Sequence, residues 1–497
     1  MLTLSFFFIM HKMLHGFYPL KKVIWLKINI LIMDNEIFNK QGLFYYEDNE
    51  FTGIIKKNEN GSLEVNTLNP IIFSKDDFVL ITGHVNGKKV SFVMYNHFIY
   101  SHSTEHTWEV TYLIHSLFIG ETYTNFDQLK FKNISLKINN ISSTMRLLSS
   151  FNHNFTSETE KKYSPLIINP QKDMVVNFEN FILKIRLNHF YESRGNFGNG
   201  QYANFKEEII IIIEYSKKEN LNIIIGDIRI IQNLFTFLTG RSRIIELNAF
   251  DKEYEDINLI IPMVSNEVIN RSQYPSAIQL TNSNIENITK KWFENYKQFN
   301  SVYDLYFSLE DSHLNSSTLF LTYAQILESY HRQRYEGEYA DNQKFKRISK
   351  KVRKCLKETD EIKAIEDNNV RIELTNKIVS SIKFSYEFTL HDRLLELFNE
   401  LNVYEFFQEI LHKFVNDADD PIEDFCNLIK NNRNYYTHYG DKSENVLDDE
   451  NLVELNEALN MVIKLIFLKE LDFKVDEVNE ITSKDKTFRL NSYVSWM

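Results

Sequence analysis

The first part of the chain, residues 34–263, alternates short apolar runs with turn residues, a pattern typical of β-strands. Residues 78–85 and 88–94 are two such runs, and they are joined by Asn86-Gly87, a pair that favours the tight turn of a hairpin. Twelve of the 14 glycines lie in the first 240 residues, which fits turn-rich β structure. We predict a β-rich sandwich or barrel here. The other predicted elements are strands within 174–187, 206–215 and 221–224 and a helix near 229–238.

The pattern changes after a linker predicted at 264–284, which is rich in Asn, Ser and Pro. Residues 285–470 contain almost no Gly or Pro, and their apolar positions recur at helical spacing. An antiparallel helical bundle is the simplest way to pack such helices. The fold class predicted is therefore α+β multidomain, a β-rich domain followed by an all-α bundle, with a charged tail at 471–497. Helices are predicted near 286–301, 316–334, 345–358, 370–384, 390–398, 404–415, 422–438 and 451–470.

Residues 1–33 begin with an apolar run, but lysines interrupt it before the ~20 residues that a membrane span requires. The segment also has no small-residue cleavage site of the usual signal-peptide kind. We expect a non-native leader or an alternative start, with Met33 as the natural first residue. A membrane-associated leader is the alternative, and no stable membrane span is predicted.

The formal net charge is −12, which is opposite in sign to that of a protein that coats nucleic acid without regard to sequence. Any contact with RNA must therefore be local. Its two cysteines, Cys355 and Cys426, do not form a disulfide framework and indicate a reducing, cytoplasmic compartment. One basic stretch stands out, and it is either a solvated helix face or a surface that steers a substrate. It comprises Arg332, Arg334, Lys344, Lys346, Arg347, Lys350, Lys351, Arg353, Lys354 and Lys357.

Candidate chemistry lies at the end of the helix predicted at 422–438. Asp420 can cap this helix and Pro421 suits its first position. Gly440 suits the left-handed position just past its end. Arg433 and His438 therefore fall in the last turns or at the corner that follows.

Histidine can exchange a proton near neutral pH, and arginine presents a fork of donors that suits phosphate. With Asn434 beside them, Arg433 and His438 are adequate for cleaving a phosphodiester without metal, because RNA supplies its own 2′-hydroxyl nucleophile. The competing interpretation is a solvated helix end with no chemistry.

The motif Arg433-Asn434-x-x-x-His438 resembles the signature of HEPN-domain ribonucleases. Residues 318–332, with Leu327-Glu328-x-Tyr330, resemble the first long helix of the ApeA-like HEPN group. Upstream, 42–45, 52–55, 61–65 and the hairpin at 81–83 resemble the ApeA N-terminal domain that accompanies this HEPN type.

The resemblance implies an antiviral, anti-phage endoribonuclease of the abortive-infection type, with the β-rich domain at 34–263 as the sensor and HEPN at 285–470. Two subunits would bring their motifs together in one metal-independent site. His438 would move protons, Arg433 would stabilise the phosphate charge, and Asn434 would position the substrate. The expected partners are RNA (tRNA or mRNA), a second copy of the chain or a larger assembly, and a viral protein or infection signal. The alternative function is a non-catalytic helical dimerisation module joined to a β-rich ligand-recognition domain.

A metal site is conceivable at His102, Glu105 and His106, since histidines four apart can share a helix face. Their surroundings are typical of a polar loop, and no third ligand is evident, so we expect no metal and no cofactor. The sequence contains no phosphate-binding Gly-rich loop, no nucleophile elbow and no Cys-x-x-Cys.

Overall fold

The structure is a computed structural model of the chain. It describes residues 37–58, 62–71, 73, 78–103, 108–139, 141, 144, 173–194, 202–240, 242–250, 256–260, 278–309, 312, 314–415, 418–439 and 446–484. The chain divides into two compact units, residues 1–286 and 287–497, and each is described by itself. The predicted leader at 1–33 and most of the predicted linker lie outside the described residues.

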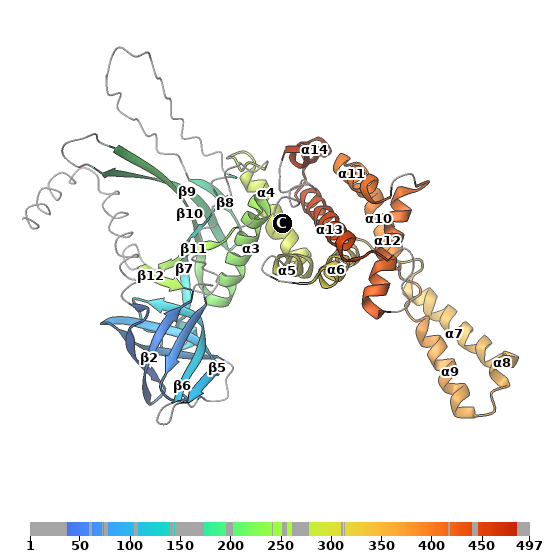
Figure 1. The fold of residues 1–497 in the computed structure, drawn as a ribbon, viewed down its shortest axis with the longest axis horizontal. Helices are drawn as coiled ribbons and strands as arrows, with labels where there is room; N and C mark the ends of the chain where they lie inside the picture. The colour runs from blue at the N-terminus through green and yellow to red at the C-terminus, as the bar shows by residue number, and fades with distance from the viewer. Residues whose placement is uncertain are drawn as a thin grey trace, which may run out of the picture. The chain divides into compact units, whose positions relative to one another are not determined.

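The first unit begins with a closed six-stranded barrel (Figure 1). Its strands run in the order β3-β2-β1-β4-β5-β6, and a pairing of β3 with β6 closes the cylinder. Their bounds are β1 Gln41–Tyr46, β2 Asn49–Lys57, β3 Leu63–Thr67, β4 Phe78–Val85, β5 Lys88–Ser103 and β6 Trp108–Ile119.

Alternating side chains fill the barrel. Along β4, Val79, Ile81 and Val85 are buried, as the strand period of two requires. The predicted hairpin is confirmed, because Val85 pairs with Lys88, and both Asn86 (φ 51°) and Gly87 (φ 78°) adopt the positive φ of its tight turn.

A second set of strands continues from β6 in the order β12-β11-β7-β10-β9-β8. The long pair β9 and β10 is antiparallel, from Phe181 with Tyr215 to Arg194 with Tyr202. Contacts with β7 and β10 place α3 (Leu221–Thr239) beside this sheet. The other bounds are β7 Lys130–Ile138, β8 Met174–Asn177, β9 Phe181–Arg194, β10 Tyr202–Asn220, β11 Ile244–Phe250, β12 Asp256–Ile260 and a 3-10 turn η1 Phe126–Gln128.

The prediction of a strand at 221–224 is wrong, because α3 begins at Leu221. Its isoleucines have high β propensity, but Leu221, Ile224, Ile228 and Ile231 recur at helical spacing and are all buried. The helical face that they form outweighs the propensity of the single residues. By length and composition α3 could also cross a membrane, although 61% of its most apolar window is buried within the protein.

A half-buried carboxyl on α3 makes stability depend on pH. Tyr215 donates a hydrogen bond of 2.9 Å to Asp227 Oδ2. Burial raises the pKa of Asp227 to about 6, and the nearby Glu219 adds to this. Because the pKa in the folded state exceeds the unfolded value of 3.8, the folded state is favoured at low pH and loses that advantage as the pH rises from 3.8 through 6.

Replacing Asp227 with Asn, which still accepts the bond from Tyr215, is therefore expected to raise stability at pH 7.5 relative to wild type by about 1–2 kcal/mol. At pH 4 the two proteins should differ little. Thermal unfolding midpoints of both proteins across this range measure the effect. A difference that does not change with pH would contradict the assignment.

The second unit is helical, as predicted. Its helices include α4 Ile285–Gln298, α5 Asn300–Ser308, α6 Ser316–Arg334, α7 Asn342–Glu358, α8 Asp360–Lys363, α9 Asn368–Ser381, α10 Leu390–Leu401, α11 Glu405–Phe414, α12 Pro421–His438, α13 Asp449–Glu470 and α14 Val475–Lys484.

The unit differs from the predicted simple bundle in three ways. First, α7, α8 and α9 form a helical arm that extends away from the other helices of the unit (Figure 1). No side chain of α7 is buried. Second, part of the predicted tail is α14, whose Val478 and Ile481 are buried, and which contacts α11 and α13. A separate helix α5 also lies beyond the first predicted one, and its Tyr303 stacks on Phe467 of α13.

Candidate active site

The helix that carries the motif begins and ends at defined residues. Asp420 accepts a hydrogen bond of 3.1 Å from the Glu423 amide, and Pro421 occupies the first turn, so the predicted cap is confirmed. The helix ends at His438, where Tyr439 takes the left-handed conformation (φ 47°). The expected residue for that position was Gly440, which lies outside the described residues.

One face of α12 is buried against α6 and α10. Phe425, Cys426 and Ile429 are fully buried, and Phe425 packs on Phe398 of α10 with ring centroids 5.5 Å apart. Near the other end, Tyr436 contacts Phe320 in the first turns of α6. The end of α12 therefore lies beside the beginning of α6.

Two residues in the last turns of α12 are bonded to Leu447, which lies just before α13. The fully buried Asn432 accepts a hydrogen bond of 2.9 Å from the Leu447 amide and donates one of 2.8 Å to Leu428 O. One turn further, Tyr436 donates a bond of 2.8 Å to Leu447 O, and burial raises the pKa of its hydroxyl. The backbone amide and carbonyl of Leu447 are thus both bonded to side chains of the last turns of α12.

The predicted site residues lie on the same last turns of α12, on the sides that Asn432 and Tyr436 do not occupy. Asn434 and His438 are exposed, and Arg433 is half-buried. Asn434 and His438 are four residues apart and share one face, whereas five positions place Arg433 roughly 140° from His438 around the axis. Within the described part of the chain, none of these three side chains has a hydrogen-bond or ion-pair partner. The fold therefore presents an amide, an imidazole and a guanidinium on a rigidly held helix end.

The neighbouring asparagines, Asn432 and Asn434, test the distinction between residues that hold the helix end in place and residues that are exposed for chemistry. Replacing Asn432 with Ala should cost about 1–3 kcal/mol, because it removes a buried group that is bonded to Leu447 and Leu428. Replacing Asn434 with Ala should change stability by less than about 0.5 kcal/mol. Urea unfolding of the two variants measures the difference. Equal losses would show that Asn434 is structural as well.

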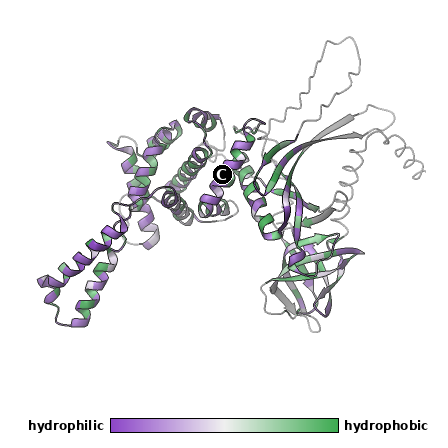
Figure 2. Ribbon diagram, turned by 180° about the vertical axis from the view of Figure 1, so that it is seen from behind, coloured by the Kyte–Doolittle hydropathy of each residue, from purple (hydrophilic) through white to green (hydrophobic). Residues whose placement is uncertain are grey.

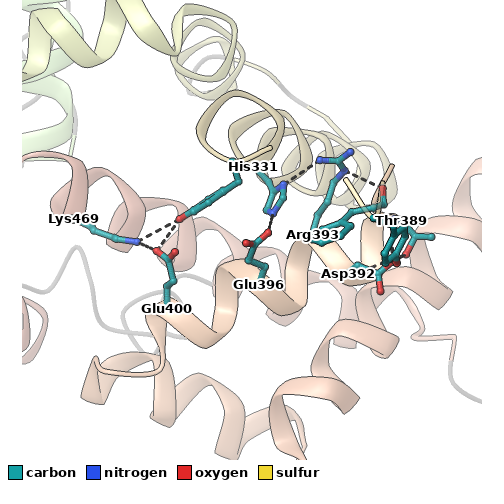
Figure 3. A network of polar contacts seen from close by, with 10 residues as sticks. His331, Thr389, Asp392, Arg393, Glu396, Glu400 and Lys469 are labelled. Carbon is teal, nitrogen blue, oxygen red and sulfur yellow. Dashed lines mark hydrogen bonds and ion pairs between the residues drawn. The ribbon is translucent and has the colours of Figure 1, made fainter. Parts of the chain in front are cut away.

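A second polar cluster, which sequence reasoning missed, lies between α6 and α10 (Figure 3). His331 is fully buried and Arg393 is 2% exposed. Arg393 Nη1 donates to His331 Nδ1 at 3.1 Å, and His331 Nε2 lies 2.8 Å from Glu396 Oε2. Because a guanidinium can only donate, His331 must carry its proton on Nε2 and give it to Glu396. Burial lowers the pKa of His331, which agrees with a neutral ring.

This cluster holds the base of the arm. Arg393 Nε donates to Phe388 O at 3.1 Å, and the Phe388 amide donates to Gly337 O at 2.8 Å. Gly337 has φ +59°, and a Cβ there would lie 2.5 Å from Arg393 Nη1. The segments that precede and follow the arm, at Gly337 and Phe388, thus both contact the buried Arg393. Spacing could have revealed His331, since Phe320, Ala324, Leu327 and His331 follow one helical face.

The predicted absence of a metal site remains a prediction. His102, Glu105 and His106 lie outside the residues whose side chains the structure describes. Among the side chains that are described, no group of three or more His, Cys, Asp or Glu residues could hold a metal ion.

The fold and the matches to known families define a two-part protein, a β-barrel unit followed by a HEPN-type helical unit. The model of "ApeA N-terminal domain 1" matches residues 39–302, and that of "Apea-like HEPN" matches residues 321–477. The chain belongs to the ApeA family, and the predicted architecture is confirmed.

No curated protein matches the chain. Among solved structures it is similar to MrkH, described as a novel c-di-GMP-dependent transcription regulatory factor. The identity is 6%, the TM-score is 0.15, and the match covers 42% of this chain and 90% of that one. At that TM-score the likeness says nothing about the fold or the ligands of this chain.

Proposed function

We propose that the chain is an antiviral, metal-independent endoribonuclease whose activity resides in Arg433, Asn434 and His438. The match to the HEPN family supports a nuclease that acts on RNA. The observation that carries the proposal is the contrast on the last turns of α12. Asn432 and Tyr436 are bonded to the backbone of Leu447, while the three polar residues of the motif are left available.

The reaction needs no group that these residues lack. His438 removes the proton from the 2′-hydroxyl of the RNA, and the 2′-oxygen forms a bond to the phosphorus. The guanidinium of Arg433 stabilises the charge on the pentavalent phosphate, and Asn434 donates a hydrogen bond that positions it. The bond to the 5′-oxygen breaks, and that oxygen leaves with a proton as a 5′-hydroxyl. The other product ends in a 2′,3′-cyclic phosphate.

Helix geometry favours a site made by two copies of the chain. Arg433 and His438 of one helix are roughly 140° apart around the axis and about 7.5 Å apart along it. Two antiparallel copies of the helix end could bring the arginine of one toward the histidine of the other. In such a site, one His438 acts as the base, and His438 of the second copy acts as the acid.

The β-rich first unit is proposed to keep the cleavage rate of the purified chain low but measurable, and an infection signal that binds to this unit, such as a viral protein, is proposed to raise that rate. A ribonuclease that acts on host tRNA or mRNA in the cytoplasm requires such restraint. The family match to an ApeA N-terminal domain supports this assignment.

Product analysis tests the chemistry. The purified full chain is incubated in chelator with an end-labelled RNA and with DNA of the same sequence. Cleavage of the RNA alone, with 2′,3′-cyclic phosphate ends, is expected because DNA lacks the nucleophile. Cleavage of the DNA, or an absolute need for a divalent metal, would contradict the proposal.

A further inference from the structure

Helix α7 of the arm carries its charges on one side. At 100° per residue, its basic residues span about half of the helix circumference, and its apolar residues Phe345, Val352 and Leu356 lie on the opposite half. Eight of the 17 residues of α7 are basic, and its single acidic residue is Glu358. The basic residues are Lys344, Lys346, Arg347, Lys350, Lys351, Arg353, Lys354 and Lys357.

These charges are available for a partner. Arg353 donates to Asn376 of α9 at 2.6 Å, but the six lysines and Arg347 have no ion-pair or hydrogen-bond partner for their side chains among the described residues. They are all exposed. The whole chain has a net charge of −12, so this concentration of unpaired positive charge is local and opposite in sign to the rest. Figure 2 shows α7 as predominantly hydrophilic.

The arrangement favours a polyanion over a lipid surface. A helix that lies on a membrane inserts its apolar face beside its basic one. In α7 the half-buried Phe345, Val352 and Leu356 lie on the side away from the basic residues, and α7 packs against α9. What remains for a partner is the basic face, which matches a chain of phosphates.

We propose that the basic face of α7 is the docking surface for the phosphate backbone of the RNA substrate. This inference rests on the proposed function for the identity of the polyanion. Two exposed aromatic residues, Tyr339 and Phe384, lie next to the arm where the chain enters and leaves it, and each is 59% exposed. Such rings can stack on unpaired bases.

The docking surface is separate from the candidate active site. The base of the arm adjoins the beginning of α12, because His391 at the start of α10 lies 3.0 Å from Glu423. His438 is at the other end of α12, about 22 Å further along the axis. We therefore expect a dinucleotide to be too short to contact both the base of the arm and His438 of the same chain.

The experiment compares two triple variants, each of which removes three positive charges from the full chain. The first replaces Lys346, Lys350 and Lys354 with Gln, and these lysines form one stripe of α7 at a spacing of four residues. The matched control replaces Lys413, Lys474 and Lys484 with Gln, and these lysines lie on the same unit outside the arm. A third variant has Arg at the three α7 positions. Binding of a labelled tRNA is measured as a function of salt, and cleavage is measured for the tRNA and for a dinucleotide.

We expect the α7 Gln variant to bind tRNA about tenfold or more weakly at physiological salt, with the slope of log K against log salt reduced by about 2. The Arg variant and the control should bind as wild type does, and dinucleotide cleavage should be unchanged in all. Unchanged tRNA affinity in the Gln variant would overturn the inference and leave the nuclease intact. Lysine-dependent binding to anionic vesicles without RNA binding would also overturn it. If wild type bound RNA through α7 but did not cleave it, the proposed nuclease function would be contradicted, and the docking surface for RNA would still be supported.

Discussion

Replacing His438 with Ala is expected to lower the rate of RNA cleavage by a factor of at least about 10²–10⁴, the range that a positioned acid or base contributes. His438 is exposed at the last residue of α12 and has no side-chain partner among the residues described. The unfolding midpoint should therefore stay at the wild-type value. A large loss of rate without a loss of stability is the signature of a group that takes part in the reaction.

His412 provides the matched control. It is also an exposed histidine in the last turn of a helix, α11, and it is not part of the motif. His412→Ala should leave both cleavage and stability unchanged. If His438→Ala cleaved RNA at the wild-type rate, the motif would be a solvated helix end and the site would lie elsewhere.

Replacing Arg393 with Ala is expected to destabilise the helical unit by about 3–5 kcal/mol. The side chain is 2% exposed and donates to His331 and to the Phe388 carbonyl, and it lies 3.5 Å from Glu387. Its loss would leave the buried acceptor of His331 unpaired and a cavity at the base of the arm. Chemical unfolding followed by circular dichroism measures the change.

Arg332 is the control for charge alone, because it also pairs with Glu387, at 2.6 Å, but its side chain is 46% exposed. Arg332→Ala should cost no more than about 1 kcal/mol, since solvent screens exposed pairs. Similar losses in the two variants would mean that the buried cluster has no special role in holding the arm.

Local signals in the sequence predicted several elements well. The Asn86-Gly87 hairpin was predictable because few residues accept positive φ at both turn positions. The beginning of α12 was predictable because Asp420 and Pro421 act within one turn of each other. In both cases the interactions that decide the structure are local.

Other features depend on contacts between distant parts of the chain. Residues 221–224 have the composition of a strand, and only burial along the whole of α3 favours the helix. His331 is bonded to Arg393 and Glu396, which lie on another helix. The spacing of these three residues in the sequence therefore gives no sign of the cluster. The arm is similar, because an exposed basic helix can lie on a bundle or extend from it with the same pattern.

The candidate site was predictable as a set of residues and not as an arrangement. The motif gave Arg433, Asn434 and His438, and the structure adds that Asn432 and Tyr436 hold the same turns in place. No spacing rule assigns those two residues to the backbone of Leu447, because Leu447 itself lies outside the helices.

The most direct test of the central claim is the rate of cleavage of a labelled RNA in chelator as a function of protein concentration, for wild type and for Arg433→Ala. If two copies of the motif form one site, the wild-type rate per chain should fall on dilution below the dissociation constant of the dimer. Arg433→Ala should be inactive at every concentration, with its folding intact. Cleavage that persists in Arg433→Ala, or a rate per chain that does not change down to the monomer, would contradict the account.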